Sequence, residues 1–125
     1  MAGKASFHPL RLKRVYAPAE DGDGFRVLVD RLWPRGVAKN KARIDLWLKD
    51  VAPSDDLRRR FHGETTKWRE FVAAYDRELR KEPACAAAES LRERARSEPV
   101  TLLYAARDEE HNNAVALKTL IEREG

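Results

Sequence analysis

Cysteines, histidines and long apolar runs are scarce in this sequence, and each scarcity excludes a class of protein. Cys85 is the only cysteine, so the chain forms no internal disulfide and no cysteine-based metal cluster. The three histidines lack the short spacing of metal ligands, so no metal site is expected. No stretch approaches the roughly 18 apolar residues of a membrane span, and the first residues lack the apolar core of a signal peptide. We therefore expect a cytoplasmic protein with no membrane partner.

Familiar catalytic signatures are absent as well. The sequence contains no glycine-rich phosphate-binding loop and no GxSxG nucleophile motif. Cys85 lies in an alanine-rich helical segment without a nearby histidine, which is typical of a buried small residue rather than a nucleophile. The sequence therefore does not identify a reaction, a cofactor or an oligomeric state, and it does not decide whether the protein is an enzyme.

Length and composition indicate one folded domain. A chain of 125 residues is long enough to bury a core, and 42% of its residues are hydrophobic. Residues 1–9 have the composition of a flexible arm that ends at Pro9, and we expect residues 10–125 to form a single α/β domain. The net charge of +4 is a mild excess, which many proteins that handle anions share.

Four segments have the pattern of β-strands. Residues 10–16 alternate between apolar and basic side chains, which predicts a strand with one wetter face. Residues 25–30 and 100–105 are nearly continuous apolar runs, as in central strands that are covered on both faces. Residues 44–48 fit either a third strand or a short helix, and we favour the strand.

Helix signals follow the predicted strand at residues 44–48 and the predicted strand at residues 100–105. Ser54 can cap a helix whose first turn is acidic and whose last turn holds three arginines, with Gly63 as its stop. A helix over residues 65–80 has one apolar stripe, Pro83 suits the first turn of the next helix, and Asn112 can cap a final one. This order predicts a small three-layer α/β/α domain with a mainly parallel central sheet of about four strands. The stripe consists of Trp68, Phe71, Val72, Tyr75 and Leu79.

Polar residues follow two of the predicted strands, at the point where each strand ends. In an open parallel sheet, ligands bind outside the carboxyl ends of the strands, so the two clusters would share one crevice if these strands are neighbours. Arginines there could hold a phosphate or carboxylate, and amides at a helix start could bind an anion. The candidate ligand-binding residues are Arg31, Trp33, Arg35, Arg107 and Asn112, and the candidate catalytic residues are Asp30 and His111.

Each candidate also has a purely structural interpretation. Asp30 could form an ion pair with an arginine, and Trp33 could pack in the protein rather than stack on a ligand. His111 is the best-placed titratable group, because histidine titrates near neutral pH, but a histidine in a loop can equally have no function. Arg58–Arg60 could be a solvated helix end.

The positive charge is concentrated in one stretch. Between Gly24 and Arg43 there are six basic residues and a single acid, Asp30. We predict that the protein binds a small anionic ligand, such as a nucleotide or a phosphorylated metabolite, at the strand ends. The alternatives are a nucleic-acid-binding module that uses residues 26–43, and a structural or interaction protein without an active site.

Three motifs in order connect most of the chain to a known family. They are DRLWPRG at residues 30–36, IDLWLKDVAPSDDLRRRFHG at residues 44–63 and LLYAARDEEHNNA at residues 102–114. The chain resembles the YeaO-like branch of the domain-of-unknown-function 488 family from Leu10 onward. The resemblance implies a small cytoplasmic α/β/α domain of bacterial type without an established activity.

One part of the chain agrees with that family and another departs from it. The wider family tends to end a strand in valine, aspartate and arginine, with which Val29, Asp30 and Arg31 agree. It often has a glutamate and then a cysteine-histidine-arginine triplet after the last strand. Here that region contains Ala106 and the run at residues 111–113, His-Asn-Asn. The resemblance therefore does not imply any chemistry that rests on the triplet.

Overall fold

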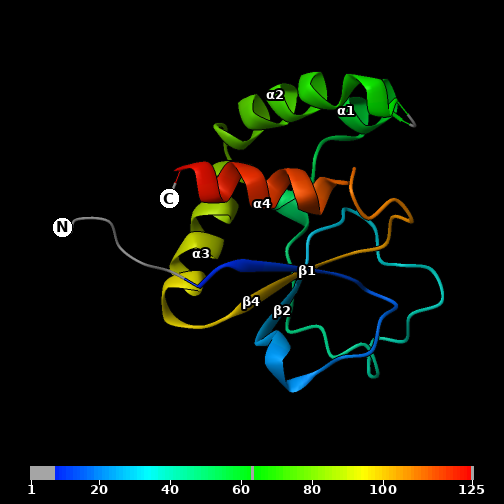
Figure 1. Cartoon of the computed structure of the whole chain (residues 1–125), viewed down its shortest axis with the longest axis vertical. Helices are drawn as coiled ribbons and strands as arrows, with labels where there is room; N and C mark the ends of the chain where they lie inside the picture. The colour runs from blue at the N-terminus through cyan, green and yellow to red at the C-terminus, as the bar shows by residue number, and fades with distance from the viewer. Residues whose placement is uncertain (1–7, 63, 125) are drawn as a thin grey trace.

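The computed structural model describes residues 8–62 and 64–124, so the predictions for residues 1–7 and for Gly63 as a helix stop lie outside the described residues. The described residues form one sheet of four parallel strands in the order β1-β4-β2-β3 (Figure 1). This confirms the prediction of a small α/β domain with a mainly parallel sheet. The strands are β1 (Leu10–Arg14), β2 (Phe25–Leu28), β3 (Leu46–Trp47) and β4 (Val100–Tyr104).

Four α-helices and three short 3-10 helices complete the described chain. None of the described helices is long and apolar enough to cross a membrane. The α-helices are α1 (Asp55–Arg60), α2 (Trp68–Leu79), α3 (Ala84–Ser97) and α4 (Asn113–Glu124), and the 3-10 helices are η1 (Asp21–Asp23), η2 (Lys49–Val51) and η3 (Thr65–Lys67).

The strand pairings follow from the apolar runs. All five residues of β4 are buried, as expected for a strand that lies between two others. β1 and β2 pair with its two edges, with Leu10 and Phe25 both opposite Val100. The segment 44–48 does contain a strand, but only two of its residues pair with β2.

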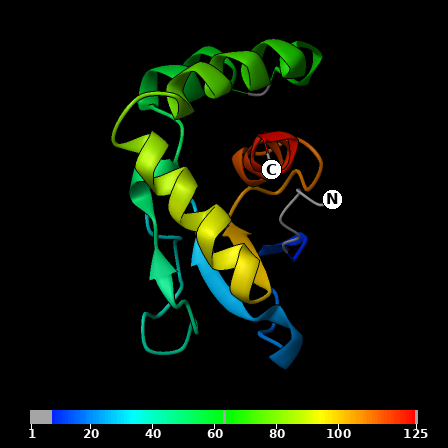
Figure 2. The same cartoon turned by 90° about the vertical axis from the view of Figure 1, so that its left-hand side faces the viewer.

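The helices lie on one face of the sheet, so the third layer of the expected three-layer arrangement is made of loops instead. Val27, Val29 and Leu102 face a core that also contains residues from all four helices. Figure 1 shows α1, α2 and α4 above the strands, and Figure 2 looks along α4 with α3 beside it. Leu28 and Leu103 face the other way. Their cover consists of Val15, Trp33, Val37, Ile44, Trp47 and Ala105, most of which come from the loops on either side of β2.

Two helix starts have the side-chain caps that the sequence predicts. The Ser54 hydroxyl accepts a hydrogen bond from the Leu57 amide at 3.1 Å, and the Asn112 carbonyl Oδ1 accepts one from the Val115 amide at 2.9 Å. The helix predicted over residues 65–80 begins as the single turn η3 and continues as α2. Local sequence signals thus fix where these helices begin.

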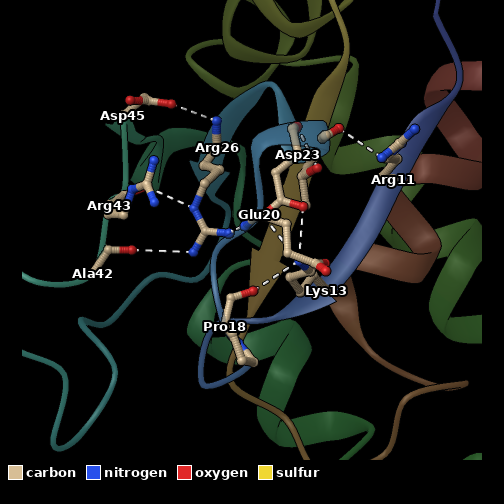
Figure 3. A network of polar contacts seen from close by, with 11 residues as sticks. Arg11, Lys13, Pro18, Glu20, Asp23, Arg26, Ala42, Arg43 and Asp45 are labelled. Carbon is tan, nitrogen blue, oxygen red and sulfur yellow. Dashed lines mark hydrogen bonds and ion pairs between the residues drawn. The ribbon is translucent and has the colours of Figure 1, made fainter.

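A closed polar network lies on the loop-covered face of the sheet (Figure 3). At its centre the buried Asp23 carboxylate accepts hydrogen bonds from the Arg26 guanidinium at 2.5 Å and from the Lys13 ammonium at 2.8 Å. The Asp23 carbonyl accepts a further bond from the Thr101 hydroxyl of β4 at 2.7 Å. Burial alone would raise the pKa of Asp23, but the hydrogen bonds from Lys13, the Glu20 amide and Arg26 outweigh it and hold the pKa below 3.8.

Arg26 is therefore not part of an exposed basic surface, although it lies in the basic stretch of the sequence. It is only 5% exposed. Besides Asp23, its guanidinium donates to the main-chain carbonyls of Ala42 and Arg43 at 3.2 and 2.8 Å. Arg26 is therefore not available to the alternative in which residues 26–43 bind nucleic acid, because burial of a guanidinium requires that its donors find acceptors inside the protein.

Gly24 connects this network to β2. Its φ angle is +66°, and a β-carbon at this position would lie 2.2 Å from the Pro99 carbonyl oxygen. The Phe25 amide donates to the same carbonyl at 2.9 Å, so the backbone cannot move away without losing this bond. Only glycine fits both the dihedral angle and the space.

Candidate functional site

A cleft of about 710 Å³ opens at the carboxyl ends of β2 and β4, within the range of about 300–1,000 Å³ that is typical of small-molecule sites. Because β2 and β4 are parallel neighbours, the polar residues that follow them meet at one edge of the sheet. A second wall comes from the end of α1 and the beginning of α2. All seven residues that the sequence singled out line the cleft: Asp30, Arg31, Trp33, Arg35, Arg107, His111 and Asn112.

Asp30 lines the cleft and connects three elements of the fold. Its carboxylate accepts hydrogen bonds from the Ala105 amide at the end of β4 at 2.9 Å and from the Asn113 side chain of α4 at 3.0 Å. Its carbonyl accepts a third bond from the Trp47 indole at 2.8 Å. Burial raises the pKa of Asp30, and the two bonds to its carboxylate oppose this in part. Within the described residues Asp30 makes no ion pair, so its geometry is that of a structural clamp.

Arg31 and Trp33 also bond to the protein itself. The Arg31 guanidinium lies 3.3 Å from the Pro53 carbonyl and 3.6 Å from the Asp55 carboxylate. The Trp33 indole donates to the Val37 carbonyl at 2.7 Å and meets Trp47 edge-on at 5.3 Å. Both residues hold the loop after β2 in place, while their outer atoms line the cleft.

Asn112 uses its side chain inside the protein. The residue is only 6% exposed, and its side-chain oxygen caps α4 while its side-chain nitrogen donates to the Asp108 carbonyl at 2.9 Å. Both ends of the side chain are thus engaged within the protein, each by one hydrogen bond. Asn112 therefore shapes the loop that carries Asp108 and His111.

Arg35 and Arg107 are the basic residues of the cleft whose charge has no partner among the described residues. Both are exposed, and neither guanidinium has a hydrogen-bond or ion-pair partner among residues 8–62 and 64–124. A hydrogen bond holds the main chain at or next to each arginine. The Tyr16 hydroxyl donates to the Arg35 carbonyl at 3.0 Å, and the Arg14 guanidinium donates to the Ala106 carbonyl, just before Arg107, at 2.9 Å. The Arg14 guanidinium lies 4.9 Å from the centre of the Tyr16 ring, so the two side chains that make these hydrogen bonds are in contact with each other.

His111 is oriented by a carboxylate. Its Nδ1 lies 3.2 Å from Asp108, which also accepts the Glu110 and His111 amides at 2.9 and 3.0 Å. These two backbone bonds hold the pKa of Asp108 below its usual range. The His111 ring is packed edge-on against Trp68 at 5.3 Å. A histidine held through Nδ1 can exchange a proton or a hydrogen bond through its other nitrogen.

The sequence did not reveal that an aromatic wall lines the cleft. Trp68 belongs to the apolar stripe that predicts core packing, but it is the first residue of α2 and is only partly buried. Phe61 and His62, just after α1, lie on the same wall. The one sequence signal that could have indicated this wall is the position of these residues at helix ends. A residue at a helix end can extend beyond the area that the core covers.

Other predicted groups lie elsewhere or are differently exposed. Cys85 is partly exposed rather than fully buried, and it does not line the cleft. The described residues contain no group of three or more histidine, cysteine or acidic side chains arranged around a metal position.

Four arginines line the cleft against three carboxylates, two of which are engaged by backbone amides.

The fold and the site define a class: a small parallel α/β domain with an arginine-lined cleft at the carboxyl ends of its central strands. The chain belongs to the family described as the inactive DUF488-N3 subclade, which matches residues 9–125. It is 43% identical to the uncharacterized protein YeaO of Escherichia coli K12 over 108 residues, which are 86% of this chain and 92% of YeaO. It is 42% identical over 92 residues to the uncharacterized proteins Rv3073c of Mycobacterium tuberculosis H37Rv and Mb3100c of Mycobacterium bovis, covering 74% of this chain and 78% of each relative. No solved structure gives a significant match.

Proposed function

We propose that this protein binds a small anionic ligand, such as a nucleotide or a phosphorylated metabolite, in the cleft, and that it does so without catalysing a reaction. The free guanidinium groups of Arg35 and Arg107 carry this proposal. An exposed arginine needs no partner, but each guanidinium presents paired donors that match a phosphate or a carboxylate, and two such groups line this one cleft. A chain with one cysteine suits the cytoplasm, where we expect the protein to act.

Binding is favoured over catalysis for two reasons. The family is described as an inactive subclade. In addition, Asp30 is engaged by Ala105 and Asn113, so it is not free to act as a base. The Asp108–His111 pair remains as a hydrogen-bonding group for a ligand. The presence of the cleft itself favours this proposal over a purely structural role.

A thermal-shift screen with nucleotides and phosphorylated metabolites tests the proposal. We expect at least one compound to raise the melting temperature of the wild-type protein, because a ligand that binds only the folded state stabilises it. The Arg35→Ala and Arg107→Ala variants should lose most of this shift. Arg123→Ala, which removes an exposed arginine from the far end of α4, is the matched control and should keep it. The proposal fails if no compound shifts the wild type or if all three variants respond equally.

Nucleic-acid binding is the second candidate, and the exposed loop after β2 favours it. Arg35, Lys39, Lys41 and Arg43 are all exposed there, although Arg26 is not. Phosphate contacts of this kind weaken steeply with salt. Electrophoretic mobility of mixed-sequence DNA and RNA at low and moderate salt would detect them, and a Lys39→Ala/Lys41→Ala variant should then bind more weakly. Unchanged mobility even at low salt would remove this candidate.

A further inference from the structure

One wall of the cleft is aromatic. Phe61 follows α1, and Trp68 begins α2, and both pack on Phe71 of the core. The Trp68 and Phe71 rings are stacked with their centres 5.5 Å apart and their planes at 27°, whereas Phe61 meets Phe71 edge-on at 5.8 Å. The His111 ring closes this wall on the side of Trp68. The rings are held in fixed positions by one another, so the wall is formed before any ligand arrives.

The rim of the cleft also exposes an aliphatic side chain. Leu32 is 67% exposed, which is the largest exposure among the big apolar residues described. Leu32 lines the cleft within the same loop that carries Arg35. An inorganic anion or a phosphorylated sugar would leave all of this apolar surface in water. A ligand with an apolar part would bury it, and burial of apolar surface is favourable in proportion to its area.

The charges give the ligand an orientation. Glu64 lines the aromatic wall, and its carboxylate has no partner among the described residues. A phosphate placed there would be repelled, whereas an amino group or a sugar hydroxyl could donate to Glu64. The free arginines come from the loops after β2 and β4 instead. The anionic end of a ligand therefore belongs at the strand ends, and its uncharged end belongs at the wall of α1 and α2.

We infer that the ligand carries a flat aromatic ring as well as its anionic group, as a nucleoside monophosphate does, and that the ring packs against Trp68. This rests on the proposed function, because it assumes that Arg35 and Arg107 hold the anion. It goes further by excluding phosphorylated sugars and simple anions as the preferred ligands. Trp68 supplies the aromatic surface and Glu64 accepts a hydrogen bond from the ring or the sugar.

Isothermal titration with matched compounds tests the inference on the wild-type protein. The probes are the 5′-monophosphates of adenosine, guanosine, cytidine and uridine, with ribose 5-phosphate as the compound that keeps the phosphate and sugar but lacks the ring. At least one nucleotide should bind about tenfold more tightly than ribose 5-phosphate, which is the usual gain from stacking one base on an aromatic side chain. Equal affinities would overturn the inference while leaving the proposed anion site intact. If none of the five compounds binds, the inference fails, and the thermal-shift screen decides the proposed function separately.

Substitution of Trp68 gives an independent test. Trp68→Ala should bring the affinity for the nucleotide down to that for ribose 5-phosphate, while Trp68→Phe should retain most of the difference. Phe25→Ala removes a partly buried aromatic ring at the opposite end of β2 and should leave the ratio unchanged. Arg107→Ala should weaken both compounds alike. A Trp68→Ala protein that folds and keeps the wild-type ratio would contradict the inference, and the comparison of compounds on the wild type decides the question if this variant does not fold.

Discussion

Two charged regions flank β2, and they differ in whether their charges are paired. At the amino end of the strand, Asp23 and Arg26 are buried and Lys13 is partly buried, and the three are satisfied by one another and by main-chain groups. At the carboxyl end, Arg35 and Arg107 line an open cleft without a partner among the described residues. We call the first region the closed network and the second the open cleft.

The difference between the closed network and the open cleft shows that a high density of basic residues does not by itself locate a binding site. Arg26 and Arg35 belong to the same basic stretch of the sequence. Arg26 has its donors directed at Asp23 and two carbonyls, so it holds the loop-covered face together. Arg35 has the free donors that a ligand could use. Pairing inside the protein, rather than charge, separates a structural arginine from a candidate functional one.

The largest effect should follow from opening the closed network. Asp23→Ala removes the acceptor that Arg26 and Lys13 share, and it should lower the free energy of unfolding by about 3 kcal/mol or more, as is usual when a buried pair loses one partner. Urea denaturation measures this. Asp21→Ala changes an exposed acid in the same turn and should cost no more than about 0.5 kcal/mol. Similar losses for both variants would show that the network is not a stabilising feature.

A somewhat smaller loss of stability should follow from Gly24→Ala, at a position beside the same network. The new β-carbon would meet the Pro99 carbonyl, and the φ angle of +66° is unfavourable for alanine. We expect a loss of about 1–3 kcal/mol, the range for strained backbone positions. Gly36→Ala is the matched control, because Gly36 has a φ angle of +79° but open space around its Cα. The comparison of the two melting temperatures separates the steric clash from the dihedral strain, and equal losses would argue against the clash.

Acid should affect the two regions in opposite directions. The pKa of Asp23 lies below its unfolded value, so Asp23 stabilises the fold above about pH 4, and this contribution is lost as the pH falls through its folded pKa. The pKa of Asp30 is raised by burial, so Asp30 takes up a proton at a higher pH in the folded state than in the unfolded state. Its contribution to the free energy of unfolding therefore increases as the pH falls. Urea denaturation between about pH 6 and 3 should show a steeper loss for the wild type than for Asp23→Asn. Equal slopes would contradict the assignment for Asp23.

The smallest effect on stability should come from the open cleft. Arg35→Ala and Arg107→Ala should change the free energy of unfolding by no more than about 0.5 kcal/mol, because neither guanidinium has a partner to lose within residues 8–62 and 64–124. The same two variants should show the largest losses of ligand binding. A destabilisation as large as that of Asp23→Ala would mean that these arginines have structural partners after all.

The sequence predicts the elements well and predicts their packing poorly. The caps at Ser54 and Asn112 are confirmed, because a cap depends on groups only three residues apart. The segment 44–48 contains a strand of only two residues, since pairing with β2, rather than its alternation, sets the length. The burial of Arg26 and the exposure of Trp68 were both missed, because each depends on which distant segments cover the side chain.

The candidate site shows the same division. The sequence by itself determined that polar residues follow two apolar strands and that the chain resembles its family. Only the tertiary structure decided that β2 and β4 are neighbours, so that Asp30 bonds to an amide 75 residues away and both clusters line one cleft. It also decided which arginines are free. The physical reason is that helix caps and periodicities arise from local contacts, whereas strand order and charge pairing depend on contacts between segments far apart in the chain.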